Sequence, residues 1–265
     1  MRTTTAVIRA ELAKLARPRV LVGAAVAAGL FALVASLTVF AGADPAATAT
    51  PGRGPTLEQL AEPGGGTRAF ATGASFVGLF VFVTFIANVA GEFSSGTLRT
   101  LLMRQPGRIR LLAGKMAALL LFAAGVLVVA EVLTLVASTA VAPTQDVATT
   151  EWFGLSGLGH AAADYLTAFS AATSWALLGM ALAVFVRSTP LALGIGIAWA
   201  GPFEHLLQDA WSAASDWFPG LLIEALAAGG TPDVSLPRAA LVVAVYVTLA
   251  AGAAFTVFTR RDVTA

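Results

Sequence analysis

The sequence predicts an all-α membrane protein, folded as a single transmembrane domain over residues 1–265. Composition is the first reason: 57% of the residues are hydrophobic, 12% are charged and the mean hydropathy is +0.82, outside the usual range of soluble domains. The second reason is a series of long apolar runs, each close to the roughly 20 helical residues that cross about 30 Å of hydrocarbon. The runs are continuous, whereas strands of a membrane barrel would alternate apolar and polar residues, so helices are expected.

Six apolar runs are expected to span the membrane: 20–42, 70–90, 116–141, 165–186, 191–208 and 239–258. The fifth is the least regular, because Gly201, Pro202, Glu204 and His205 interrupt it. The first follows basic residues, as a signal peptide would. It exceeds the about 7 to 15 apolar residues of a signal peptide, so we expect it to be retained as a span.

The orientation follows from the basic residues, which concentrate on the cytoplasmic side of membrane proteins. Of the 16 Lys and Arg residues, Arg53, Arg68 and Arg238 fall in the segments expected outside, and the remaining thirteen share the other face. Both termini are therefore expected in the cytoplasm of a multi-pass protein of the plasma membrane. High Ala, Arg and Gly content with little Lys and Asn favours a bacterial source.

Several classes of function are disfavoured by composition. A net charge of +1 does not favour a nucleic-acid partner. The chain has no cysteine and two histidines, so disulfides, catalytic thiolates and a metal site are not expected. Gly91 and Gly96 have the spacing of a phosphate-binding loop, but Thr97 stands where such a loop needs lysine. We expect no bound cofactor and no enzymatic activity in this chain.

A short amphipathic helix is predicted ahead of the first span. Apolar residues recur at helical spacing, namely Ile8, Leu12 and Leu15, and the charged residues fall elsewhere around the helix, namely Arg9, Glu11 and Lys14. Pro18 then interrupts the pattern. Such a helix lies on the inner membrane surface, although an ordinary basic anchor flank would have the same charges.

The loop between the second and third spans is polar and basic, with Glu92 as its only acid. Ser94 or Ser95 is expected to cap a short helix over 97–103. That helix has an apolar side formed by Leu98, Leu101 and Leu102, and a basic side formed by Arg99 and Arg104. The run Gln105-Pro106-Gly107 ends it. A helix held between two spans by tight turns would act as a rigid lever, whereas the simpler alternative is a solvated loop that only sets topology.

These residues resemble the ABC-2 type permeases, the membrane subunits of ATP-binding cassette exporters. The shared pattern is Glu-x-x-x-Gly-Thr, a Leu pair, a Pro, an Arg and a Lys, supplied here by Glu92, Gly96, Thr97, Leu101, Leu102, Pro106, Arg108 and Lys115. The similarity extends to Glu11-Leu12-x-Lys14-Leu15, to the six-span layout and to the irregular outer segment before the last span. It therefore covers nearly the whole chain.

The resemblance implies that the loop is a coupling helix, which docks on a separate ATPase subunit. The residues that would form this interface are Glu92, Phe93, Gly96, Thr97, Leu98, Arg99, Leu101, Leu102 and Arg104. It also implies a second permease copy, as a homodimer or a heterodimer with a similar permease, within membrane lipid. ATP and Mg would be bound by the partner ATPase, and closure of two ATPase subunits would drive outward export. The substrate stays open among drugs, antibiotics, lipids, peptides and polysaccharides.

Ionisable groups at membrane depth are the candidate pathway residues, because they are costly in hydrocarbon. Glu131 in the third span is the strongest, although a carboxyl group paired inside the bundle would explain it equally well. Glu204 and His205 follow the Gly201-Pro202 kink, and are candidates for a gate, an interfacial pair or simple solvation.

Between the last two spans, Trp217 and Phe218 belong to a segment too short to span, for which we expect one or two interfacial or re-entrant helices. These aromatic residues either gate the pathway or only anchor the interface. The alternative function is an ion-coupled transporter or channel that depends on Glu131. A serine protease built on Ser156 is disfavoured, because that residue lies in a polar outer connection.

Overall fold

The computed structural model describes residues 4–46, 54–104 and 107–260. Within these ranges the chain is helical, with a single isolated β-bridge between Asp44 and Thr56 and no strand. Five described helical segments are long and apolar enough to cross a membrane: Pro18–Ala41, Gly65–Ser94, Arg108–Gln145, Leu155–Val186 and Leu236–Arg260. The expectation of an all-α protein with long apolar helices is confirmed for these five.

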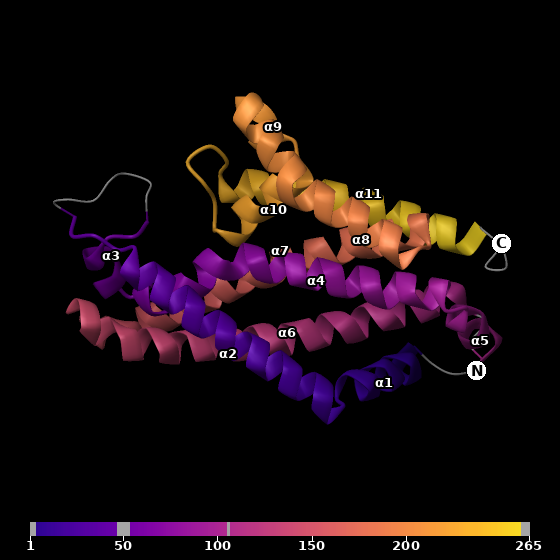
Figure 1. Cartoon of the computed structure of the whole chain (residues 1–265), viewed down its shortest axis with the longest axis horizontal. Helices are drawn as coiled ribbons and strands as arrows, with labels where there is room; N and C mark the ends of the chain where they lie inside the picture. The colour runs from indigo at the N-terminus through magenta and orange to yellow at the C-terminus, as the bar shows by residue number, and fades with distance from the viewer. Residues whose placement is uncertain (1–3, 47–53, 105–106, 261–265) are drawn as a thin grey trace.

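The long helices are α2 (Pro18–Ala41), α4 (Arg68–Ser94), α6 (Arg108–Val141), α7 (Leu155–Val186) and α11 (Leu236–Arg260). They run roughly along the long axis of the molecule (Figure 1). Helices α1 (Thr4–Leu15) and α5 (Thr97–Arg104) lie at one end together with the last turns of α11, and α3 (Leu57–Ala61) lies at the opposite end. We refer to these as the α5 end and the α3 end.

The centre of the bundle is the contact between α4 and α7, the most extensive in the chain. Glycines allow the close approach: a Cβ on Gly78 would collide with the ring of Trp175, and one on Gly179 would press on Phe82. The rings of Phe82 and Trp175 lie 5.1 Å apart. Small residues at the crossing therefore let the two backbones approach, with aromatic rings filling the space beside them.

The expected fifth span is interrupted in the structure. Helix α8 (Thr189–Ala198) is followed by a π-helical turn over Trp199–Phe203 and then by α9 (Glu204–Ala210), which projects to the side of the bundle (Figure 1). Pro202 lies within the turn and has no backbone N–H to continue the helical hydrogen bonds. The interruption therefore falls where the sequence is irregular, and this stretch is not among the five long apolar helices.

The outer segment folds back onto the bundle. Helix α10 (Pro219–Ala227) follows a 3₁₀ turn and begins with a proline, a residue preorganised for the first helical position. Its apolar side chains are buried, with Leu222 and Ile223 at most 1% exposed, and it packs against α7 and α11. A short helix is present here as expected, and most of its surface is covered by protein, whereas its interfacial or re-entrant placement stays a prediction.

Helix α1 is also confirmed, but the face it buries differs from the expected one. Val7 and Glu11 are its buried residues, whereas Ile8, Leu12 and Leu15 are only half-buried. Gly114 of α6 allows this contact, because a Cβ there would press on Val7. The prediction that Glu11 lies away from the packed face is therefore wrong, and the reason is a buried lysine on α6.

Candidate functional site

The most polar buried feature of the described residues lies at the α5 end and is centred on Lys115. Its ammonium group, on a residue 2% exposed, donates to Glu11 Oε2 at 3.0 Å, Asn88 Oδ1 at 2.9 Å and Glu92 Oε1 at 2.7 Å. All three N–H donors of the lysine are thus used. Lys14 reaches the other carboxylate oxygen of Glu11 at 2.6 Å. We call Glu11, Asn88, Glu92 and Lys115 the Lys115 cluster.

Three helices supply the Lys115 cluster. Asn88 and Glu92 lie one turn apart in the last part of α4 and so share a face. Lys115 lies two turns into α6, and Glu11 lies on α1. Burial alone would raise the pKa of Glu11, but the hydrogen bond from Lys14 and the charge of Lys115 outweigh it, so this pKa lies below its ordinary value of 4.5. The cluster therefore joins α1, α4 and α6 through paired charges.

Helix α5 begins immediately after the cluster. Gly96 joins it to α4 with a φ of +69°, a left-handed conformation that glycine adopts without strain. Leu98 is 5% exposed and packs into the main core, and Leu102 is half-buried against it. Arg99 and Met103 are exposed on the other side, so the predicted two-sided short helix is confirmed as structure.

The last turn of α4 also contacts three further helices. Ser94 Oγ lies 3.2 Å from Thr189 Oγ1 and accepts from the Thr189 backbone N–H at the start of α8. The rings of Phe93 and Phe258 of α11 pack edge to face, with their centroids 6.0 Å apart. The guanidinium of Arg187 lies over the Phe93 ring, 5.5 Å from its centroid. The last turn of α4, next to α5, is therefore in contact with the start of α8, with α11 and with Arg187 at the end of α7.

The residues predicted for an ATPase interface fall into two groups. Glu92 and Phe93 point into the protein, and the Glu92 side chain is 16% exposed. Gly96, Thr97 and Arg99 are exposed. Leu98, Leu101 and Leu102 face the core, and Arg104 ends α5. Gln105 and Pro106 lie outside the described residues. The surface offered by α5 is therefore narrower than the predicted set.

Glu131 lies apart from this end, half-buried on α6 and facing α7. It interacts electrostatically with Asp164 and Tyr165 there. Among the described residues, its Oε1 is buried and has no hydrogen-bond partner. Asp164 accepts from Thr67 Oγ1 at 2.7 Å. The charges of Glu131 and Asp164 repel each other, so Asp164 is not an ion-pair partner for Glu131.

The remaining candidates meet where α9 joins α10. Glu204 is fully buried, and its Oε2 accepts from the Leu221 backbone N–H at 2.9 Å, at the first turn of α10. His205 Nε2 lies 3.3 Å from Oε2 of Glu224, which is also on α10. Phe218 packs between Trp199 and Trp211, and Trp217 is exposed. These contacts attach α10 to α9.

Ser156 and His160 do not form a catalytic pair. The His160 ring Nδ1 lies 2.8 Å from the backbone oxygen of Ser156, and both side chains are exposed near the start of α7. A serine nucleophile needs the base at its hydroxyl. The arrangement gives no support for proteolysis.

Sequence reasoning missed the Lys115 cluster as a unit. Glu11, Glu92 and Lys115 each stood in the ABC-2 pattern, and Asn88 had no assigned role. One signal was present: Glu92 is the only acid in its basic loop, and an isolated acid suggests a specific cation partner. Glu11 and Lys115 are 104 residues apart in the sequence, so their pairing could not be predicted from local patterns.

A comparison with curated proteins finds no match to this chain. A family model matches residues 66–264, from the turn before α4 to beyond the end of α11, and its description is a protein of unknown function (DUF2705). The matched part includes Asn88, Glu92 and Lys115, and Glu11 precedes it. Because the match extends over well more than half of the sequence, the chain belongs to the DUF2705 family.

Proposed function

We propose that this chain is the permease subunit of an ATP-binding cassette exporter in a bacterial plasma membrane. It would carry six spans, counting the interrupted α8–α9 segment, with both termini and α5 in the cytoplasm. The observation that supports this most is the position of α5: a short two-sided helix between two long apolar helices, joined to α4 by the Gly96 turn and lying next to the Lys115 cluster, which joins α4 to α6.

The proposed mechanism uses α5 as the coupling helix. An ATPase subunit would press on its exposed side, where Arg99 and Met103 lie. The displacement would pass to α6 and α1 through the Glu92–Lys115 pair, and to α8 through Ser94. Charge-assisted hydrogen bonds at 2.7 to 3.0 Å are stronger than neutral ones, so they would hold these helices together during the movement. ATP and Mg would be held by the ATPase, and a second permease copy would complete the pathway.

Affinity isolation of the protein from its native membrane in mild detergent tests this proposal. An ATPase subunit should co-purify with the wild type. Arg99→Glu on the exposed side of α5 should release it, whereas Arg9→Glu, an exposed charge reversal on α1 at the same end, should not. Glu92→Gln should keep the ATPase bound and weaken its coupling to transport, because Glu92 points inward. Absence of any ATPase partner from intact protein would overturn the proposal.

A second candidate is an ion-coupled carrier, which the Glu131–Asp164 proximity favours. Two carboxyl groups that interact at membrane depth would bind a proton or cation more readily than either alone. Such a carrier would need no ATPase. Transport in vesicles that follows an imposed proton gradient, and that Glu131→Gln abolishes, would support it over the exporter.

A further inference from the structure

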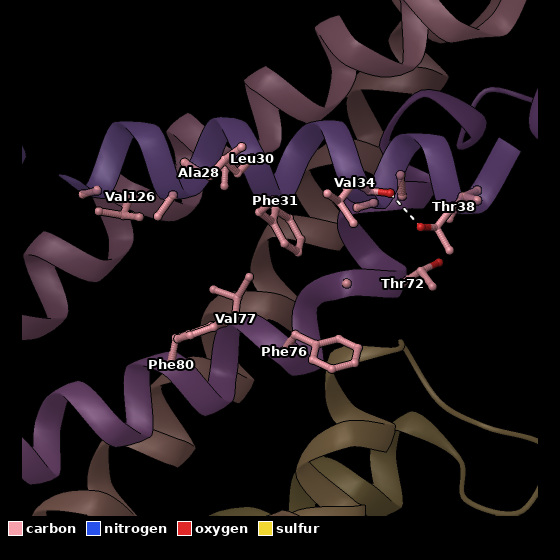
Figure 2. Close-up of a pocket in the computed structure, with 17 residues that line it drawn as sticks. Ala28, Leu30, Phe31, Val34, Thr38, Thr72, Phe76, Val77, Phe80 and Val126 are labelled. Atoms are coloured by element: carbon pink, nitrogen blue, oxygen red, sulfur yellow. Dashed lines mark hydrogen bonds between the residues drawn. The ribbon is translucent and has the colours of Figure 1, made fainter. Parts of the chain in front are cut away.

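A deep apolar groove runs between α2, α4 and α6 on the side of the bundle. Its volume is about 670 Å³, within the range of small-ligand sites. Figure 2 shows Phe31 of α2 pointing toward α4, where Val77 and Phe80 form the opposite wall. The groove lies between three of the helices that are long and apolar enough to cross a membrane, so in a membrane it would open toward the hydrocarbon.

Small residues on α2 create the groove. Ala24, Ala27, Ala28 and Ala35 face it and leave the space that larger side chains would fill. On α2 it extends from Ala24 to Val39, about 22 Å at 1.5 Å per residue, compared with about 15 Å for half of a 30 Å hydrocarbon core. The groove is therefore longer than one leaflet is thick, so a chain that runs through one leaflet can lie in it along its whole length.

The width distinguishes between possible occupants. Spread over that length, about 670 Å³ gives a mean cross-section of roughly 30 Å², whereas a helix about 10 Å across needs roughly 80 Å². A helix from a second copy could cover the groove but would not enter it. A single hydrocarbon chain would fill it and recover the dispersion contacts that an empty furrow loses.

The groove offers no free donor to a polar ligand. Its lining side chains are apolar except for two hydroxyls. Thr38 donates to the Val34 backbone oxygen and Thr72 to the Arg68 backbone oxygen, each at 2.8 Å (Figure 2 shows the first bond). An apolar furrow of this kind is not a site for ordered water. Hydrocarbon is the occupant its chemistry favours.

The α3 end of the groove carries both signs of charge. Arg68 is exposed, begins α4 one turn before Thr72, and has no ion pair within 4.0 Å among the described residues. It also lines a second cavity of about 410 Å³, with Glu62, His160 and Asp164. Arg68 directly precedes Ala69 on α4 and lies one turn before Thr72, and both of those residues line the groove. A headgroup there would find a guanidinium beside carboxylates.

We propose that this groove binds one acyl chain of a phospholipid whose headgroup carries both a phosphate and an ammonium group. The chain lies along α2 against Phe31 and Phe80. The phosphate meets Arg68, since guanidinium groups recognise phosphate well, and the ammonium meets Glu62 or Asp164. The site requires no ATPase partner, so it is independent of the proposed function.

The test uses the full-length protein in detergent micelles and a phosphatidylethanolamine with a photoactivatable acyl chain. After illumination, labelled peptides should map to the groove faces, 24–39 of α2 and 69–80 of α4. Ala27→Phe places a ring in the groove from an exposed position and should lower this labelling about tenfold, equivalent to about 1.4 kcal/mol of binding. The matched control is Ala25→Phe, because Ala25 is exposed on α2 but does not line the groove.

Competition tests the headgroup. Unlabelled phosphatidylethanolamine should displace the probe better than phosphatidylglycerol, which lacks the ammonium, and Arg68→Gln should weaken labelling more than Arg238→Gln. Each variant must elute as the wild type does, and Ala24→Leu replaces Ala27→Phe if that protein does not fold. Labelling spread evenly over α2 and unchanged by the groove variants would overturn the proposal. A groove that takes no label and crosslinks to a second copy would also overturn the proposal. Equal competition by phosphatidylglycerol would overturn the headgroup assignment.

Discussion

Replacing Lys115 with methionine should destabilise the protein by about 3 kcal/mol, the lower end of the range for breaking a buried ion pair. The methionine keeps an unbranched side chain in a site where the native residue is 2% exposed. Its sulfur cannot donate to Glu11, Asn88 or Glu92, so two carboxylates lose their shared cation. The cost stays at the lower end because Glu11 keeps Lys14 and the Glu92 side chain is 16% exposed.

The assay is unfolding by increasing sodium dodecyl sulfate in mixed micelles, followed by the fluorescence of the five tryptophans. Lys14→Met is the matched control, since Lys14 contacts the same carboxylate from a side chain 47% exposed, and exposed pairs contribute at most about 1 kcal/mol. Replacing Glu11 and Glu92 with glutamine alongside Lys115→Met should recover much of the loss, because no uncompensated charge then remains. A Lys115→Met protein that unfolds together with Lys14→Met would refute the reasoning.

Three further predictions concern other parts of the structure. The lowered pKa of Glu11 contributes stability that is fully present above its ordinary value of 4.5 and is lost as the pH falls through the folded pKa. Detergent resistance should therefore drop as the pH falls below 4.5, and Glu11→Gln should flatten that drop. Glu204→Ala removes the acceptor of the Leu221 N–H and should cost about 1 to 3 kcal/mol; faster amide exchange confined to α10 would show it, and unchanged exchange would contradict it. Gly96→Ala should cost about 1 kcal/mol, because its φ is +69° although no atom obstructs a Cβ, whereas Gly91→Ala within α4 should be neutral or stabilising; equal thermal stability of the two proteins would count against this.

The long helices could be predicted because each is specified locally. Continuous apolar runs of sufficient length have few alternatives in a membrane, since every backbone group must be paired within the segment. The short helix α5 could also be predicted, because an amphipathic stretch lies between Gly96 and the Gln105-Pro106-Gly107 run. Helix ends shifted by several residues, as in α6, which begins at Arg108 and not near 116. Basic residues can form the first turns of a helix ahead of its apolar run. A prediction based on hydropathy places the helix end at the apolar run and therefore misses these turns.

The Lys115 cluster and the junction of α9 with α10 could not be predicted from the sequence. Glu11 stands in a pattern that places it with surface charges, and only the packing of α1 on α6 brings it to Lys115. In the sequence, Glu204 lies in what we interpret as an interrupted span. Only the packing of α10 against this region brings the Leu221 backbone N–H to the Glu204 carboxylate, which accepts its hydrogen bond. In each case a buried carboxylate is explained by a partner on another helix.

The sequence by itself determined that this protein is helical, that it carries long apolar runs, five of which form helices long enough to cross a membrane, and that a two-sided short helix joins two of them. Those properties depend on side chains within one segment and on its length. Only the tertiary structure decided which charges pair, where the interrupted helix leaves the bundle and where a groove opens between α2 and α4. Those depend on distances between helices, which are determined by how close small residues let the backbones approach.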